Sequence, residues 1–140
     1  MTRQSRMNIS SYADLLTAAR QQPEPQRLLF VFTKTELPDG HTEAQNRDFQ
    51  AGTGGVLTPQ MCTDKALDEL GDFSDLVKES RQMGQDWKIV FVASLPGHAG
   101  VMPTTEEAQA PLKTMIHSIQ NGAISKYLAF DRDGDLVHIS

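Results

Sequence analysis

Two continuous apolar runs dominate the hydrophobic pattern of the chain. "LLFVF" lies within Arg27–Lys34, and "IVFVASL" lies within Trp87–Leu95. A strand with one exposed face alternates apolar and polar residues, whereas a strand covered on both faces is apolar throughout. Both runs therefore predict internal strands of a sheet, and we expect them to lie side by side.

Apolar residues at three- and four-residue spacing predict three helices, over residues 10–20, 72–84 and 104–122. Ser10 or Ser11 can cap the first helix, and Thr104 with Glu107 has the spacing of a capping box. The expected inward faces are Tyr12, Leu15, Leu16 and Ala19; Phe73, Leu76, Val77, Ser80 and Met83; and Ala108, Leu112, Met115, Ile116 and Ile119. Pro111 either kinks the third helix or marks its true first turn.

The remaining segments predict weaker elements. "VLTPQMCT" is typical of a strand, and Pro59 inside it indicates a sheet edge or a bulge. Thr63 or Asp64 can cap a helical turn that carries the next apolar residues. "TEAQNRDFQAG" predicts a short helix, and "YLAFDRDGDLVHI" predicts two short strands about a turn.

This order of elements predicts an α/β fold that borders on α+β. We expect a tail over Met1–Ile9 and a single layered domain over residues 10–140, in which helices flank a mixed sheet of about five strands and a β-hairpin closes the C-terminus. A length of 140 residues suits one such domain.

Composition excludes several classes of function. The net charge is −5, from 13 basic and 18 acidic residues, and no basic cluster occurs, so we expect neither nucleic acid nor an anionic membrane as partner. No apolar run approaches the ~18 residues of a membrane span, and no secretory signal is evident. The lone cysteine, Cys62, permits no intrachain disulfide. We therefore expect a cytoplasmic protein.

The segment "FDRDGDLVHIS" raises the possibility of a calcium loop. An EF-hand needs a glycine at position 6 and a glutamate at position 12. Counted from Asp131, Gly134 falls at position 4, and position 12 would fall beyond Ser140. We therefore predict a type I′ hairpin turn with Asp133 and Gly134 at its centre, and no metal site.

A ligand site, if the chain has one, is expected in the loops that follow the two central strands. If those strands run parallel, their carboxyl ends share one edge, where α/β proteins bind ligands. The residues expected there are His41, Gly54, Gly55, Ser94 and His98, with Thr35 beside them. The connection from Thr35 to Gly54 can be either a crossover or a long hairpin, and only the hairpin brings "GTGG" to this edge. An exposed loop histidine and a flexible glycine connection are the plainer interpretations.

No catalytic constellation is evident in the sequence. Cys62 has Asp64 nearby and only Lys65 as a close positive charge, so we expect an ordinary, half-buried thiol. Neither a G-x-S-x-G nor an H-E-x-x-H motif occurs. We therefore expect no catalytic residue, metal or cofactor.

The stretch from "SSYADLLTAARQQPEPQRLLFVF" to "FDRDGDLVHI" resembles a small group of uncharacterised bacterial proteins, some of which carry the label "ribonucleotide reductase subunit alpha". That chemistry needs several cysteines, and only Cys62 is present, so we do not expect the activity. More distantly, "LLTAAR", "LLFVF", "VLTPQMCTDKAL" and "IVFVASLPG" with "MPTTEEA" resemble the N-terminal domain of the SseB family. This resemblance implies a mixed α/β fold and favours the hairpin connection.

The leading functional hypothesis is a non-enzymatic protein that acts through protein contacts, either with a partner or as a homodimer. The alternative is a small-molecule-binding protein or minor enzyme, with its pocket at the loops that follow the central strands.

Overall fold

The computed structural model describes residues 9–36, 42–50, 56–84 and 86–137. Its helices are α1 (Tyr12–Arg20), α2 (Glu43–Gln50), α3 (Phe73–Gln82) and α4 (Thr105–Gln120), and a 3₁₀ turn, η2, spans Leu67–Glu69. Its strands are β1 (Gln26–Glu36), β2 (Val56–Ala66), β3 (Ile89–Pro96) and β4 (Leu128–Phe130). Of the expected tail, only Ile9 lies within these ranges.

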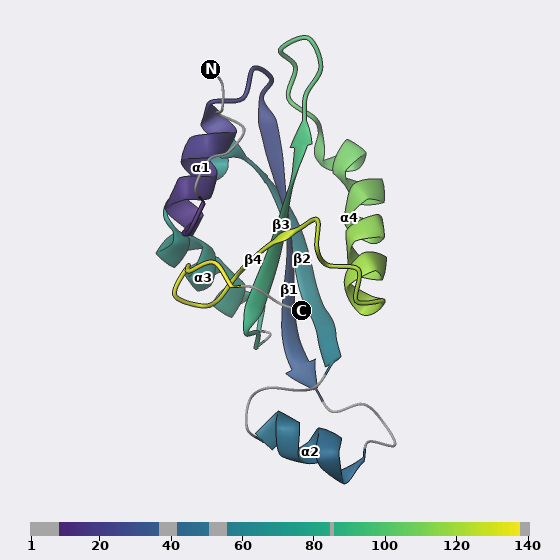
Figure 1. The fold of residues 1–140 in the computed structure, drawn as a ribbon. Helices are drawn as coiled ribbons and strands as arrows, with labels where there is room; N and C mark the ends of the chain where they lie inside the picture. Colours follow the sequence, from purple (N-terminus) through teal and green to yellow (C-terminus); the bar gives the residue numbers. More distant parts are fainter. Residues whose placement is uncertain (1–8, 37–41, 51–55, 85, 138–140) are drawn as a thin grey trace.

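The sheet has four strands in the order β2-β1-β3-β4, and every neighbouring pair is antiparallel. The two apolar runs lie side by side as β1 and β3, as predicted. The expectation of a mixed sheet of about five strands is wrong, and the architecture is α+β. The connection from β1 to β2 is a long hairpin, with α2 beyond the ends of the two strands (Figure 1).

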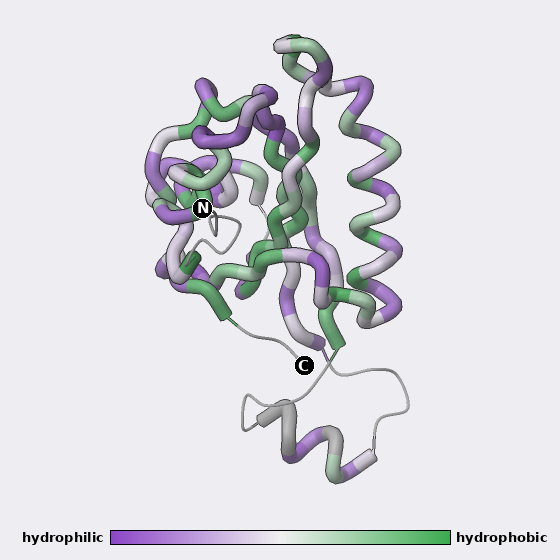
Figure 2. Tube along the Cα trace, turned by 45° about the horizontal axis from the view of Figure 1, so that its top comes forward, coloured by the Kyte–Doolittle hydropathy of each residue, from purple (hydrophilic) through white to green (hydrophobic). Residues whose placement is uncertain are grey.

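Helices cover both faces of the sheet, which is why β1 and β3 are apolar throughout. Helices α1 and α3 lie over one face, and α4 lies over the other (Figure 1). The first layer is centred on Phe30, Phe32 and Trp87, and the second on Val31 and Phe91. Figure 2 shows hydrophobic residues gathered along the central strands. Burial of each large apolar side chain contributes about 1.5–3 kcal/mol to folding.

Most of the predicted helix signals hold. Ser11 caps α1, and Thr104 and Glu107 form the capping box of α4. Pro111 lies inside α4, so it does not mark the first turn of that helix. Met83 is 43% exposed, so its predicted inward position is wrong.

The segment after β2 also differs from the expectation. Thr63 and Asp64 do not cap a helical turn, because β2 continues to Ala66. The shorter turn η2 follows, and its first free N–H group, that of Ala66, donates to Glu69 Oε1 at 2.8 Å. The Glu69 side chain, at the end of the turn, therefore satisfies this N–H group in place of the expected cap.

The C-terminal turn is longer than the predicted type I′ turn. Gly134 N–H donates to Asp131 O at 3.1 Å, and Asp131 N–H donates to Asp135 O at 3.0 Å. This is a three-residue loop closed by Gly134, whose φ is +83°, while Asp133 keeps a negative φ. The returning arm makes two isolated bridges, Asp135 with Ser11 and Leu136 with Phe130, so the predicted second strand does not form within the described residues.

Candidate functional site

The antiparallel register separates the residues expected to share a ligand site. Ser94 and His98 lie at the end of the sheet where β1 begins, because Gln26 pairs with Pro96. Thr35 pairs with Leu57 at the opposite end. The premise that β1 and β3 have their carboxyl ends on one edge is therefore wrong. His41, Gly54 and Gly55 lie outside the described residues.

The loop that carries His98 is a tight hairpin turn, and its backbone explains its shape. His98 and Val101 exchange two backbone hydrogen bonds, of 3.1 and 2.9 Å. Ala99 (φ +52°) and Gly100 (φ +81°) both have the positive φ that a type I′ turn requires. Glu24 accepts a hydrogen bond from Gly100 N–H at 2.8 Å. The imidazole of His98 is exposed, and the geometry of this loop indicates a structural turn.

β2 is one of the two edge strands of the sheet, so its outer side has no neighbouring strand among the described residues. Ala66 N–H points away from β1, because it donates to Glu69. Backbone groups of alternate residues in an antiparallel strand point the same way. The N–H and C=O groups of Cys62 and Asp64 therefore also point outward. Within the ranges that the structure describes, neither residue has a backbone hydrogen bond on that side.

The two charged side chains near this edge, those of Asp64 and Lys65, form ion pairs within the chain. Asp64 Oδ2 lies 2.7 Å from Arg27 Nε, and the two side chains are 10% and 11% exposed. Thr105 Oγ1 joins the pair, accepting from Arg27 at 2.8 Å and donating to Asp64 at 2.9 Å. Lys65 Nζ lies 2.8 Å from Glu79 Oε2 on α3. Both charged side chains of the segment Met61–Lys65 are therefore paired within the chain, and neither is free to repel an approaching strand.

Cys62 lies at the centre of this segment. Cys62 as a whole residue is exposed, so the expectation of a half-buried residue is wrong, although the sulfur itself is partly shielded. Partial burial of the sulfur, followed by the carboxylate of Asp64, raises the thiol pKa. The raised pKa keeps the sulfur protonated at neutral pH, which is unfavourable for a nucleophile.

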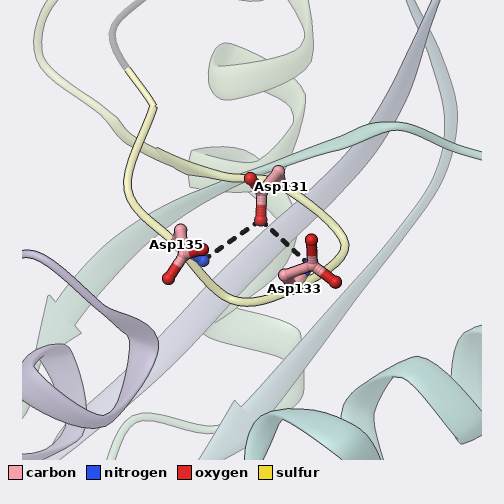
Figure 3. Close-up of side chains that lie close together, drawn as sticks. All are labelled: Asp131, Asp133 and Asp135. Carbon is pink, nitrogen blue, oxygen red and sulfur yellow. Dashed lines mark hydrogen bonds between the residues drawn. The ribbon is translucent and has the colours of Figure 1, made fainter.

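The C-terminal turn brings three carboxylates together, as Figure 3 shows. Ligand atoms of Asp131, Asp133 and Asp135 lie within 4.8 Å of one another. The carboxylate of Asp131 accepts the backbone N–H of Asp133 at 2.9 Å and of Asp135 at 3.1 Å. Asp131 therefore has a structural role in closing the turn, and the absence of a calcium site stays a prediction.

A hollow of about 620 Å³ lies between this turn, α1 and the beginning of α3. Tyr12 lines it, is 2% exposed, and has no hydrogen-bond partner for its hydroxyl among the described residues. Sequence patterns gave no signal for this hollow, because its walls come from three segments that are far apart in the chain.

Comparison with protein-family models, with curated proteins and with solved structures gives no match to this chain. Among the helices that the structure describes, none is both long enough and apolar enough to cross a bilayer.

Proposed function

We propose that the chain is a non-enzymatic, cytoplasmic contact protein that pairs with a second copy of itself through the outer edge of β2. The observation that carries the proposal is the row of outward backbone groups at Cys62 and Asp64, which have no partner in the described part of the chain. An open strand edge is a template for adding a strand from another chain.

The side chains of this edge favour pairing with a strand of another chain, because they do not protect the edge with a free charge. Natural proteins commonly protect an edge with a free charge, especially lysine. Here Lys65 is held by Glu79, and Asp64 is held by Arg27. The charged groups therefore do not repel an approaching strand.

The same segment is compatible with two-fold symmetry. In an isologous dimer, each copy presents the same patch to the other. Antiparallel pairing centred on Cys62 or Thr63 places neither Asp64 nor Lys65 opposite its own copy. Like charges opposite each other would destabilise a strand pair, and this arrangement avoids them.

Two features limit the length of the pairing segment. Pro59 and a bulge in β2, where the register passes from Phe32–Met61 to Thr33–Pro59, interrupt the ladder on one side. On the other side, Ala66 N–H is already bonded to Glu69. Pairing is therefore confined to a short segment around Met61–Lys65, so we expect a weak dimer whose population rises with protein concentration.

Sedimentation velocity over a series of protein concentrations, in reducing buffer, tests the proposal. Cys62→Pro removes an outward N–H while leaving the groups that face β1 in place. We expect dimers for the wild type and for the control Cys62→Ala, and a monomer for a folded Cys62→Pro protein. A wild type that stays monomeric at the highest concentration would refute self-pairing.

A second candidate function is the binding of a small molecule. It is favoured by the hollow over Tyr12, because a volume of about 620 Å³ lies within the range of ligand pockets. This position replaces the pocket expected at the ends of the central strands.

A further inference from the structure

A second hollow, of about 270 Å³, lies between α3 and the C-terminal turn and adjoins the hollow over Tyr12. Phe73 and Val77, both half-buried, form its apolar lining. Three cations and one carboxylate also line it, so positive charge is in excess there although the chain has a net charge of −5. Such a hollow attracts an anion. These charged residues are Lys78 and Arg81 of α3 and Arg132 and Asp133 of the turn.

One face of α3 supplies two of these cations. Residues three and four apart are neighbours on a helix, so Lys78 and Arg81 lie together, and Val77 lies one turn before Arg81. Within the ranges that the structure describes, neither cation forms an ion pair, because the ion pairs there use other basic residues. Like charges at this spacing repel each other, so an anion bound between them relieves the repulsion.

The third cation, Arg132, is held in place and keeps part of its hydrogen-bonding capacity. Both hydrogen bonds that its side chain donates, to Asp86 and to the carbonyl of Trp87, come from Nη1. Its Nε and Nη2 have no acceptor in the described part of the chain. The edge formed by these two nitrogens can donate two parallel hydrogen bonds to one anionic group, which is the geometry that phosphate and carboxylate oxygens fit.

We propose that this hollow binds a small phosphate monoester with an apolar body. A phosphate monoester carries a charge of about −1.5 to −2 at neutral pH, which matches the excess of two positive charges better than a carboxylate does. Its phosphate group lies among the three cations, and its apolar body packs on Phe73 and Val77. This inference goes beyond the proposed self-pairing, and it does not depend on the edge of β2.

Four matched probes test the proposal by ¹H–¹⁵N NMR titration of the full chain at about pH 7.5, where a phosphate monoester is mainly a dianion. Phenyl phosphate carries the dianion and the ring. Phenyl sulfate has nearly the same shape with one negative charge fewer, inorganic phosphate lacks the ring, and benzylamine reverses the charge. We expect millimolar binding of phenyl phosphate, with shifts at the amides of Ser74, Val77 and Asp133 in the walls. Phenyl sulfate and inorganic phosphate should bind more weakly, and benzylamine should not shift these amides.

Three variants and one control assign the contacts. Lys78→Gln and Arg81→Gln should each weaken phenyl phosphate about 2- to 5-fold, because each removes one exposed charge while glutamine keeps the helix. Val77→Ala should weaken phenyl phosphate about 2-fold and leave inorganic phosphate unchanged, because only the ring contacts this side chain. Lys113→Gln removes an exposed charge from α4, on the other face of the sheet, and should change neither affinity.

Several outcomes would overturn the proposal. Phenyl phosphate that shifts none of the three wall amides would show that the hollow holds no such ligand. Equal losses of affinity in Lys78→Gln and in the control Lys113→Gln would mean attraction by the whole protein and not by this hollow. Inorganic phosphate that binds as tightly as phenyl phosphate, in the wild type and in Val77→Ala, would indicate an adventitious ion only.

Discussion

Arg132 stacks on Trp87 and thereby holds the C-terminal turn against the core. Its guanidinium lies 4.8 Å from the centroid of the indole ring, and its Nη1 donates to the carbonyl of Trp87 at 3.0 Å. Trp87 itself is 1% exposed, and its Nε1 donates to Ser80 Oγ at 2.8 Å. One side chain of the turn therefore covers the largest residue of the core.

Loss of this contact should destabilise the protein. We expect Arg132→Ala to lower the free energy of unfolding by about 1–2 kcal/mol, because a cation–π contact and a hydrogen bond to a charged group are both lost. Arg132→Lys keeps the charge but loses the planar stacking, so its effect should be intermediate. Urea unfolding measures both variants, and a lysine variant as stable as the wild type would contradict the stacking role.

The turn at His98 contains a strained residue that can be relieved. Ala99 has a φ of +52°, whereas asparagine followed by glycine is preferred in a type I′ turn. We expect Ala99→Asn to raise the free energy of unfolding by up to about 1 kcal/mol. The control Ala110→Asn, at an exposed position of α4, should instead lower it, because asparagine is a poorer helix former. Changes of the same sign at both sites, measured by thermal unfolding, would refute the strain argument.

The unpartnered hydroxyl of Tyr12 gives a prediction about stability that is separate from ligand binding. We expect Tyr12→Phe to raise the free energy of unfolding by about 1 kcal/mol, because it removes a buried polar group that has no partner among the described residues. Tyr127→Phe, at the half-buried second tyrosine, should change it by less than about 0.5 kcal/mol. A destabilised Tyr12→Phe protein in chemical denaturation would show that the hydroxyl has a partner.

The N-terminal cap of α3 should make stability depend on acid pH. The hydroxyl of Ser74, followed by the N–H of Asp75, holds the pKa of Asp72 below its ordinary value of 3.8. A carboxyl group with a lowered pKa stabilises the folded state above its unfolded value, and this contribution is lost as the pH falls through the folded pKa. Asp72→Asn still caps the helix but does not titrate.

The stability difference between wild type and Asp72→Asn should therefore shrink from about pH 5 to about pH 2. Urea unfolding at several pH values measures it. A difference that stays constant over this range would mean that the carboxyl group is not held in the folded state.

Local patterns predicted the elements well, because their causes are local. The apolar runs of β1 and β3 arise because helices bury both faces of these strands. The capping box of Thr104 and Glu107 involves only one turn of helix. Pro59 predicted an edge or a bulge, and β2 has both.

Strand direction could not be predicted from these runs. A fully apolar strand indicates cover on both faces, and parallel and antiparallel neighbours satisfy that condition equally. The prediction that Ser94 and His98 share an edge of the sheet with the loop after β1 required β1 and β3 to run parallel. These strands are antiparallel, so the loop that follows each of them lies at the opposite end of the sheet. The outward groups of Cys62 and the hollow over Tyr12 depend on register and packing between distant segments, which periodicity does not report.

Amide hydrogen exchange at Cys62 and Asp64 tests the proposed pairing most directly. Thr63 is an internal reference, because its N–H faces β1, where its register partner is Phe30. Self-pairing predicts that exchange at Cys62 and Asp64 slows as the protein concentration rises, while exchange at Thr63 stays slow throughout. Rapid exchange at Cys62 and Asp64 at every concentration, beside a protected Thr63, would show that the edge of β2 does not pair with a second copy.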